Sequence, residues 1–138
     1  MAYDPQNPFA KILRGELPCF KLYEDEQTLA FMDIMPQSDG HALIIPKEAA
    51  VTILELSEAS AMACIGVTRK IAIAVEKALN CSGIQVVQLN GAEAGQTVPH
   101  AHFHVIPRYE KSALAIHAAK LGDMDKIRAL AEKIVAAL

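Results

Sequence analysis

The chain has 138 residues, of which 52% are hydrophobic and 21% are charged, and its formal net charge is −3. This length and composition predict one globular domain over residues 1–138 and argue against long disordered regions. No run of lysine or arginine is long enough to follow a nucleic-acid backbone, so polymeric nucleic acid is a poor candidate partner, whereas a single nucleotide is compatible with this charge.

The sequence also bears on location. The N-terminal stretch "MAYDPQNPFAKILRG" has no basic start followed by an apolar core, and no apolar run approaches the roughly 20 residues needed to span a bilayer. The three cysteines, Cys19, Cys64 and Cys81, are odd in number and far apart, which is typical of a protein in a reducing compartment. We therefore expect a cytoplasmic protein that does not associate with membranes.

The first third of the chain predicts a short helix and then a hairpin. Asn7 can cap the helix, Pro8 suits its first position, and Gly15 can end it in the left-handed conformation. The stretch "CFKLYEDEQTLAFMDIMP" contains two extended runs around a polar turn at residues 24–27. Two strands joined by this turn are the expected structure.

The second strand of this hairpin carries an acidic residue. Period-two alternation places Asp33 on the same face as Leu29 and Phe31. A carboxylate beside Phe31 needs an explanation. From the residues alone two interpretations stay open, because Asp33 could be solvated where the strand ends or could serve a function.

The middle of the chain predicts a buried strand and a long helix. The strand "ALIIPK" is entered through a turn at Gly40 and His41. Ser57 can cap a helix that runs to about Asn80. Its apolar positions include Ile65, Ile71, Val75 and Leu79. We expect this helix to be the main element that packs against the sheet.

The last part predicts two more strands and a helix. The strands are "GIQVVQLN" and "VPHAHFHVIPR", joined by the loop "GAEAGQT". A final helix from Asp123 to about Leu138 has Ile127, Leu130 and Ile134 at helical spacing. Because the strands cluster before and after one long helix, the pattern favours the α+β class, with an antiparallel sheet and helices on one side.

Three histidines occupy alternate positions of the last predicted strand. His100, His102 and His104 would form one row there, with the residues between them facing the core. Such a row spans roughly 13 Å, which is too far for one zinc ion with bonds of about 2.1 Å. Two of them could share a metal with His41 as a further ligand. A solvated strand face that is rich in histidine is the least favoured interpretation.

A third interpretation is phosphoryl or nucleotidyl transfer. A neutral imidazole is a good nucleophile near neutral pH, and close histidines suppress one another's protonation. The loop ahead of the strand supports this interpretation, since Asn90, Gln96 and Thr97 offer uncharged donors for a phosphate.

The stretch "AGQTVPHAHFHVIPR", together with "PFAKILRGELP" and "YEDEQTLAFMDIMPQSDGHALIIPK", resembles the histidine-triad (HIT) nucleotide hydrolases and transferases. The resemblance covers about residues 7–108 and leaves 109–138 as a variable C-terminal segment with a final helix. It implies a HIT-like α+β fold with an antiparallel five-stranded sheet, one long helix and short terminal helices. It also implies a homodimer whose sheets join, and a purine nucleotide as substrate.

The same resemblance assigns a role to each site residue. It implies that His102 attacks the α-phosphate and forms a nucleotidyl-histidine, that His100 and His104 orient the phosphate and relay protons, and that His41 supports them. Asn90, Gln96 and Thr97 would contact the phosphate or the leaving group. Asp33 would bind the ribose hydroxyls. The base pocket would be lined by Phe9, Ile12, Leu17, Phe31 and Ile34.

Two comparisons with branches of this family refine the expected reaction and metal content. The transferase branch carries glutamine at the third triad position, so His104 favours hydrolysis. Some bacterial relatives bind a structural zinc through Cys-x-x-Cys, a histidine after the "IPK" strand and the first triad histidine. Here residues 7–10 contain no cysteine and Ala49 replaces the histidine. We therefore expect no metal and no cofactor.

The expected function is a metal-independent purine nucleotide hydrolase, an adenosine 5'-phosphoramidase that releases AMP. Alternatives are a dinucleoside polyphosphate hydrolase, a nucleotide-binding regulatory protein with incidental hydrolysis, and a zinc hydrolase that uses His41 with two triad histidines. The fifth histidine, His117, lies beyond the matched stretches and is expected to be an ordinary surface residue.

Overall fold

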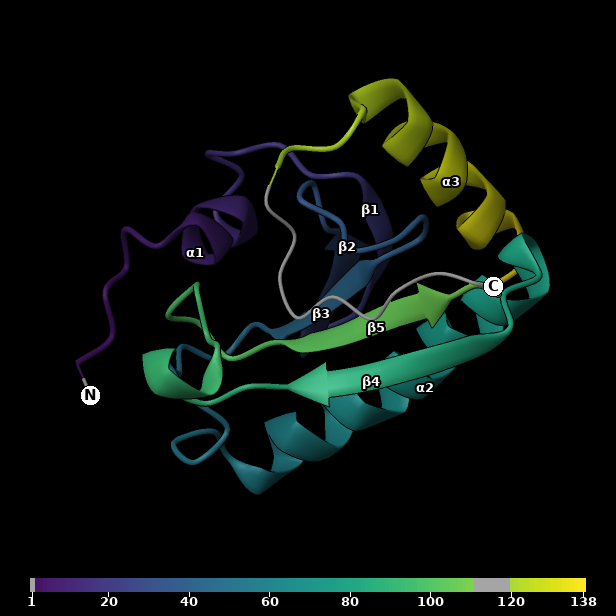
Figure 1. Ribbon diagram of the computed structural model, residues 1–138. Coiled ribbons are helices and arrows are strands. Elements are labelled where there is room, and N and C mark those ends of the chain that lie inside the picture. The colour runs from purple at the N-terminus through teal and green to yellow at the C-terminus, as the bar shows by residue number, and fades with distance from the viewer. Residues whose placement is uncertain (1, 111–119) are drawn as a thin grey trace.

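The computed structural model describes residues 2–110 and 120–138, so His117 lies outside the described residues. Five strands form one antiparallel sheet in the order β1-β2-β3-β5-β4 (Figure 1). The elements are α1 (Pro8–Leu13), β1 (Lys21–Glu24), β2 (Thr28–Met32), β3 (Ala42–Pro46), α2 (Glu58–Leu79), β4 (Gly83–Gln88), the 3-10 turn η1 (Ala92–Ala94), β5 (Phe103–Arg108) and α3 (Met124–Ala136). The predicted α+β class is confirmed.

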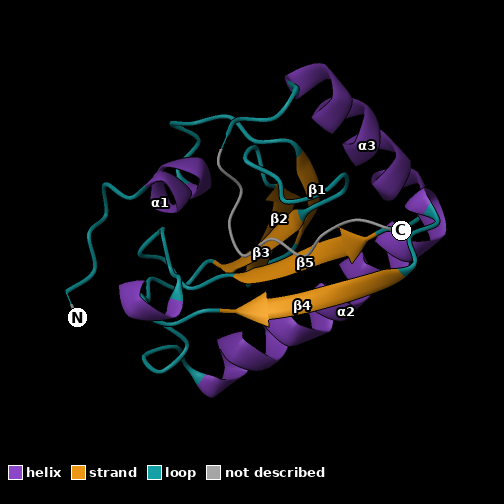
Figure 2. Ribbon diagram, in the orientation of Figure 1, coloured by secondary structure: helices purple, strands orange, loops and turns teal. Residues whose placement is uncertain are grey.

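The sheet is covered on both faces, which corrects the expectation of helices on one side. Ala30 and Met32 of β2 belong to a core shared with α2 and α3. Leu29 and Phe31, on the opposite face of the same strand, pack against Phe9 of α1. Figure 2 shows the short α1 apart from the long α2, which runs alongside β4. Every residue of β2 is therefore buried, and α1 makes a second, smaller core.

The helix ends follow their capping residues. The Asn7 side chain accepts a hydrogen bond from Ala10 N, and the Ser57 side chain accepts one from Ser60 N. Asn80 itself adopts the left-handed conformation that ends α2. Asp123 caps α3, which buries Ile127 and Ile134 as predicted.

The apolar positions of α2 do not all face the core. Ile71 and Val75 are buried, but the side chain of Ile65 is 51% exposed. Ile65 lies six residues before Ile71, so at about 100° per residue its side chain is turned about 120° away from that of Ile71 around the helix. It therefore belongs to the outer surface of α2.

The last strand begins later than predicted. Val98 was the expected start, but β5 begins at Phe103, opposite Gln88 of β4 and Ile44 of β3. Pro99 has no N–H to offer a neighbouring strand, and Ala101 N donates to the Ala50 carbonyl instead. His100 and His102 therefore lie outside the paired part of the sheet.

No helix within residues 2–110 and 120–138 is both long enough and apolar enough to cross a membrane.

Gly40, directly before His41, provides a test of the turn into β3. Its φ is +97°, and a Cβ there would overlap the Leu79 side chain and lie 3.1 Å from Cγ of Pro107. Gly40→Ala should therefore lower stability by about 2–3 kcal/mol, the sum of left-handed backbone strain and overpacking. Gly15→Ala is the matched control, since φ is +78° but nothing lies within 4 Å of its added Cβ. Thermal unfolding should show a clearly smaller loss for Gly15→Ala, and equal losses would contradict the packing argument.

Candidate active site

Four histidines from three segments lie together on the face of the sheet that α1 covers. His104 of β5 is paired with Leu43 of β3, which belongs to the α1 core. The ring of His104 has its centroid 5.2 Å from that of His41 and 4.9 Å from that of His102. His100 completes the group through its backbone carbonyl, which lies 2.6 Å from Nδ1 of His102. The structure thus brings the four predicted histidines together, although only His104 belongs to a strand.

The protons of His100 and His102 can be assigned from their partners. A carbonyl oxygen only accepts hydrogen bonds, so a ring nitrogen that contacts one must carry the proton. Nδ1 of His102 therefore donates to the carbonyl of His100, which leaves Nε2 of the neutral ring as a lone pair. Nε2 of His100 donates to the carbonyl of Pro46 at 2.8 Å.

His41 and His104 form a second pair with an assigned direction. The backbone N–H of Gln37 donates to Nδ1 of His41 at 3.0 Å, so a neutral His41 carries its proton on Nε2. That nitrogen lies 2.9 Å from Nδ1 of His104, to which it donates, and 3.4 Å from Oδ2 of Asp33. A neutral His104 consequently carries its own proton on Nε2.

Burial favours the uncharged form of His41, His100 and His102. Desolvation lowers the pKa of His100 and of His102. Desolvation, with the nearby His104 as a second cause, lowers the pKa of His41 to about 3. The ion-pair distance between His41 and Asp33 would favour charge on both, but the bond from Gln37 occupies the nitrogen that a second proton would need. We conclude that His41 is neutral at physiological pH.

Asp33 lies just after the end of β2, with its side chain 18% exposed. Its Oδ1 accepts a hydrogen bond from the backbone N–H of Met35 at 2.8 Å. Burial raises the pKa of Asp33 to about 6, against the lowering effect of that hydrogen bond. The carboxylate is therefore neither freely solvated nor paired with a cation of fixed charge, and its functional role stays a prediction.

Asp33, His41 and His104 have ligand atoms within 4.8 Å of one another, so a metal there must be tested. A neutral imidazole that binds a metal through Nε2 carries its proton on Nδ1. In His41 that proton would point at the N–H of Gln37, which already donates to Nδ1. These donors do not suit a metal ion.

The zinc position of some family members fails a similar test. The side chain of Asn7 caps α1, and residues Ala10 and Ala49 offer no ligand. The remaining candidate, His100, has one ring nitrogen bonded to Pro46 and the other 2.6 Å from the hydroxyl of Tyr3. The residues present therefore do not fit that zinc.

The loop before β5 uses two of its three predicted phosphate-binding side chains for its own structure. Gln96 accepts from Gly91 N and donates to the carbonyls of Val51 and Val98. Asn90 accepts a hydrogen bond from Ile53 N at 2.8 Å. Thr97, by contrast, is exposed. The phosphate role of these residues stays a prediction; Gln96 is buried, Asn90 is half-buried and Thr97 is exposed.

The predicted base pocket is an apolar patch around α1. Phe9 and Phe31 are buried and meet edge to face, with ring centroids 5.4 Å apart. Ile12 packs against them, whereas Leu17 and Ile34 are 40% and 45% exposed. The patch thus has a buried floor and an exposed rim, and Phe9 also lies against His102, with centroids 5.0 Å apart.

The C-terminal segment supports the loop after β2. The N–H of Gly122 donates to the carbonyl of Ile34 at 2.8 Å, and Lys126 of α3 forms an ion pair with Asp39 at 3.0 Å. Residues 120–138 therefore contact the loop between Asp33 and His41. The sequence alone did not assign a role to this C-terminal segment.

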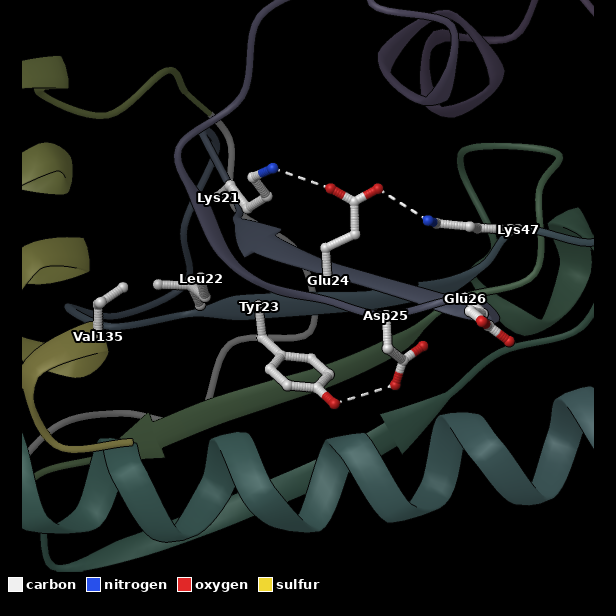
Figure 3. A pocket seen from close by; sticks show the side chains of 8 residues that line it. All are labelled: Lys21, Leu22, Tyr23, Glu24, Asp25, Glu26, Lys47 and Val135. Carbon is white, nitrogen blue, oxygen red and sulfur yellow. Dashed lines mark hydrogen bonds and ion pairs between the residues drawn. The ribbon is translucent and has the colours of Figure 1, made fainter.

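A separate hollow at the β1 edge does not compete with this site. Figure 3 shows Glu24 between Lys21 and Lys47, to each of which it is bonded at 2.8 Å. The two lysines thus share Glu24 as their partner, and neither a histidine nor a cysteine lines the hollow. We place the candidate active site at the histidines because only they combine buried neutral rings with assigned proton positions.

Sequence reasoning missed three partners of the histidines. Tyr3, Gln37 and Pro46 each contact a ring nitrogen. Two of them act through backbone atoms, which every residue possesses, so no side-chain pattern could have identified them. Tyr3 is 97 residues away from His100 in the chain.

Comparisons with known proteins point to one family. Residues 14–111 match the family described as HIT domain. Adenosine 5'-monophosphoramidase hnt1 of Schizosaccharomyces pombe is 46% identical over 100 residues, which cover 72% of this chain and 72% of that protein.

Solved structures agree with this match. A Hit-like protein involved in cell-cycle regulation from Bartonella henselae has a TM-score of 0.92 at 44% identity, covering 99% of this chain and 100% of that chain. A zinc-bound histidine triad family protein from Mycobacterium smegmatis has a TM-score of 0.85 at 31% identity, and the match covers 96% of this chain and 92% of that chain. The predicted HIT-like fold is confirmed.

The raised pKa of Asp33 predicts a pH-dependent effect on stability. Between its ordinary pKa of 3.8 and about 6 the folded state binds more protons than the unfolded state, so this group lowers stability as pH rises through that window. Relative to the wild type, Asp33→Asn should therefore gain about 2–3 kcal/mol between pH 4 and pH 7. Urea unfolding at both pH values measures the gain.

The matched control for this experiment is Asp125→Asn, because the Asp125 side chain is 92% exposed. It should change stability by only a few tenths of a kcal/mol at either pH. A pH-independent difference between Asp33→Asn and the wild type would contradict the assignment.

Proposed function

Since the chain belongs to the HIT domain family, we propose that it is a nucleotide hydrolase that acts at the α-phosphate of a purine nucleotide. The substrate class we favour is an adenosine 5'-phosphoramidate, cleaved to AMP and an amine. Its similarity to the phosphoramidase of Schizosaccharomyces pombe supports this choice.

The observation that carries the proposal is the proton assignment of His102. Its Nδ1–H is held by the carbonyl of His100, so the lone pair of a nucleophile is on Nε2. The adjacent Phe9 fixes the plane of the ring from the α1 side. A ring held at one nitrogen and buried in its neutral form needs no prior deprotonation to attack phosphorus.

In the proposed reaction, Nε2 of His102 attacks the α-phosphorus and the P–N bond breaks. The leaving amine takes its proton from solvent, because loss of the Nε2 proton from a neutral His104 would leave an imidazolate; the Nε2–H of His104, beside His102, instead donates a hydrogen bond to the phosphate. A water molecule then attacks the phosphorus of the nucleotidyl-histidine and gives up a proton to solvent, and the bond to Nε2 of His102 breaks to release AMP. His100 and His41 hold their neighbours in the required tautomers.

Substrate binding would use the surroundings of the triad. Asp33 would accept hydrogen bonds from the ribose hydroxyls, and the apolar patch around Phe9 and Phe31 would take the base. Thr97 would donate to the phosphate from the exposed loop. We assign Gln96 and Asn90 to the support of that loop as well, because they tie it to the backbone of Val51 and Ile53 in the segment before α2.

Three alternatives make different predictions. A dinucleoside polyphosphate hydrolase would use the same nucleophile with a nucleotide as leaving group. A regulatory nucleotide-binding protein would not need a nucleophile, so the arrangement of His102 favours the enzyme. Zinc hydrolysis is disfavoured by the hydrogen bond from Gln37 to His41.

We also infer a homodimer formed through β4 and α2. β4 is an edge strand, and Val86, paired with the buried Val105, is 50% exposed on the α2 side of the sheet. Met62, Ile65 and Ile73 of α2 are exposed at helical spacing. A second copy would cover this apolar surface and join the two sheets.

His102→Asn tests the nucleophile. Turnover of an adenosine phosphoramidate should fall by at least about 1000-fold, because asparagine cannot form the covalent intermediate, while AMP binding is retained. Mass spectrometry of wild-type enzyme quenched in base should reveal one AMP bound to His102, because the P–N bond of a nucleotidyl-histidine survives base but not acid. Normal turnover by the variant would overturn the mechanism.

A substrate comparison tests the class of reaction. Turnover of an adenosine phosphoramidate should exceed that of diadenosine polyphosphates, and a chelator should leave both rates unchanged because no metal takes part. Faster cleavage of the dinucleotides would favour the first alternative. Loss of activity with chelator and recovery with zinc would favour the metal mechanism.

A further inference from the structure

We propose that Tyr3 is a positioning residue of the histidine triad, holding His100 in one tautomer and orientation and, through His100, holding the nucleophile His102. The inference rests on the proposed function of His102. Tyr3 precedes the family match, which begins at residue 14, and nothing in the sequence pattern pointed to it.

The contact is short and its geometry is defined. The Tyr3 hydroxyl lies 2.6 Å from Nδ1 of His100, and the two rings meet edge to face with centroids 5.6 Å apart. His100 is fully buried. No buried side-chain nitrogen or oxygen among the described residues is without a partner. Tyr3 satisfies one of the two nitrogens of that buried ring.

The direction of this hydrogen bond follows from the other nitrogen. Nε2 of His100 faces the carbonyl of Pro46 and must donate, so Nδ1 of the neutral ring has only a lone pair. The Tyr3 hydroxyl therefore donates. Without it the lone pair of a fully buried nitrogen would lose its partner, and an unsatisfied buried acceptor is costly.

The position of His100 matters because the sheet does not hold it. β5 begins at Phe103, so residues 100–102 are outside strand pairing. The carbonyl of His100 nevertheless has to receive Nδ1–H of His102 at 2.6 Å, and it can do so only while the His100 backbone is fixed. Tyr3 and Pro46 clamp the ring of His100 from its two nitrogens and thereby fix that backbone.

Tyr3 is itself held in place by its own segment. Asn7 donates from its backbone N–H and from its side chain to the carbonyl of Asp4. Arg14 donates to the carbonyl of Pro5 at 2.6 Å. The residues after Tyr3 are thus tied to the start and end of α1, so the hydroxyl is preorganised.

The test is Tyr3→Phe, which keeps the ring and removes the hydroxyl. With an adenosine phosphoramidate as substrate, kcat should fall about tenfold while KM changes by less than about twofold, because the nucleophile is misplaced but the nucleotide contacts stay. The matched control is Tyr23→Phe on β1, whose hydroxyl donates to Asp25 at 3.1 Å as Figure 3 shows, with β2 and β3 between it and β5. Its kcat and KM should equal those of the wild type.

A second measurement does not depend on activity. Nitrogen-15 NMR of the histidine rings should show His100 protonated on Nε2 and His102 on Nδ1 in the wild type, with the Nδ1 signal of His100 displaced in Tyr3→Phe and unchanged in Tyr23→Phe. Unchanged kcat in Tyr3→Phe, an equal loss in Tyr23→Phe, or an unmoved His100 signal would each overturn the inference. If wild-type protein turned over no nucleotide, the proposed function would fail, while the NMR result would still decide whether Tyr3 positions His100.

Discussion

A backbone carbonyl can only accept a hydrogen bond, and this constraint determines the chemistry of the buried histidines. The carbonyl of Pro46 requires a proton on Nε2 of His100, and the carbonyl of His100 requires one on Nδ1 of His102. The N–H of Gln37 is a donor, so Nδ1 of His41 must accept its hydrogen bond and carries no proton. Three backbone groups thus choose the tautomers, and a nucleophilic lone pair on His102 is the result.

This arrangement depends on the chain leaving the sheet before β5. Inside a strand, the carbonyl of His100 would point toward a neighbouring strand and could not meet the ring of His102. Pro99 and the bond from Ala101 to Ala50 take the segment off the ladder. The same departure removes the support of strand pairing, so side-chain contacts such as that of Tyr3 have to replace it.

The second core under α1 supplies the environment in which these assignments matter. Phe9 lies against both His100 and His102, which removes water from their rings. Exclusion of water lowers the pKa of the histidines and raises that of Asp33. The rings therefore stay neutral, and the charged form of Asp33 lowers the stability of the folded protein. A site of this kind accepts local instability in exchange for reactive protonation states.

The sequence by itself determined the secondary-structure elements and which histidines belong to the candidate active site. Capping at Asn7 and Ser57 and the alternation in β2 depend on local geometry, and the structure confirms these predictions. The histidines do lie together, but only His104 of the predicted row belongs to the strand. Tertiary structure alone decided where β5 starts, that α1 covers the second face, and which nitrogen of each ring carries the proton. These depend on backbone groups and on residues as distant as Tyr3, and a backbone carbonyl leaves no mark in the identity of the residue that contributes it.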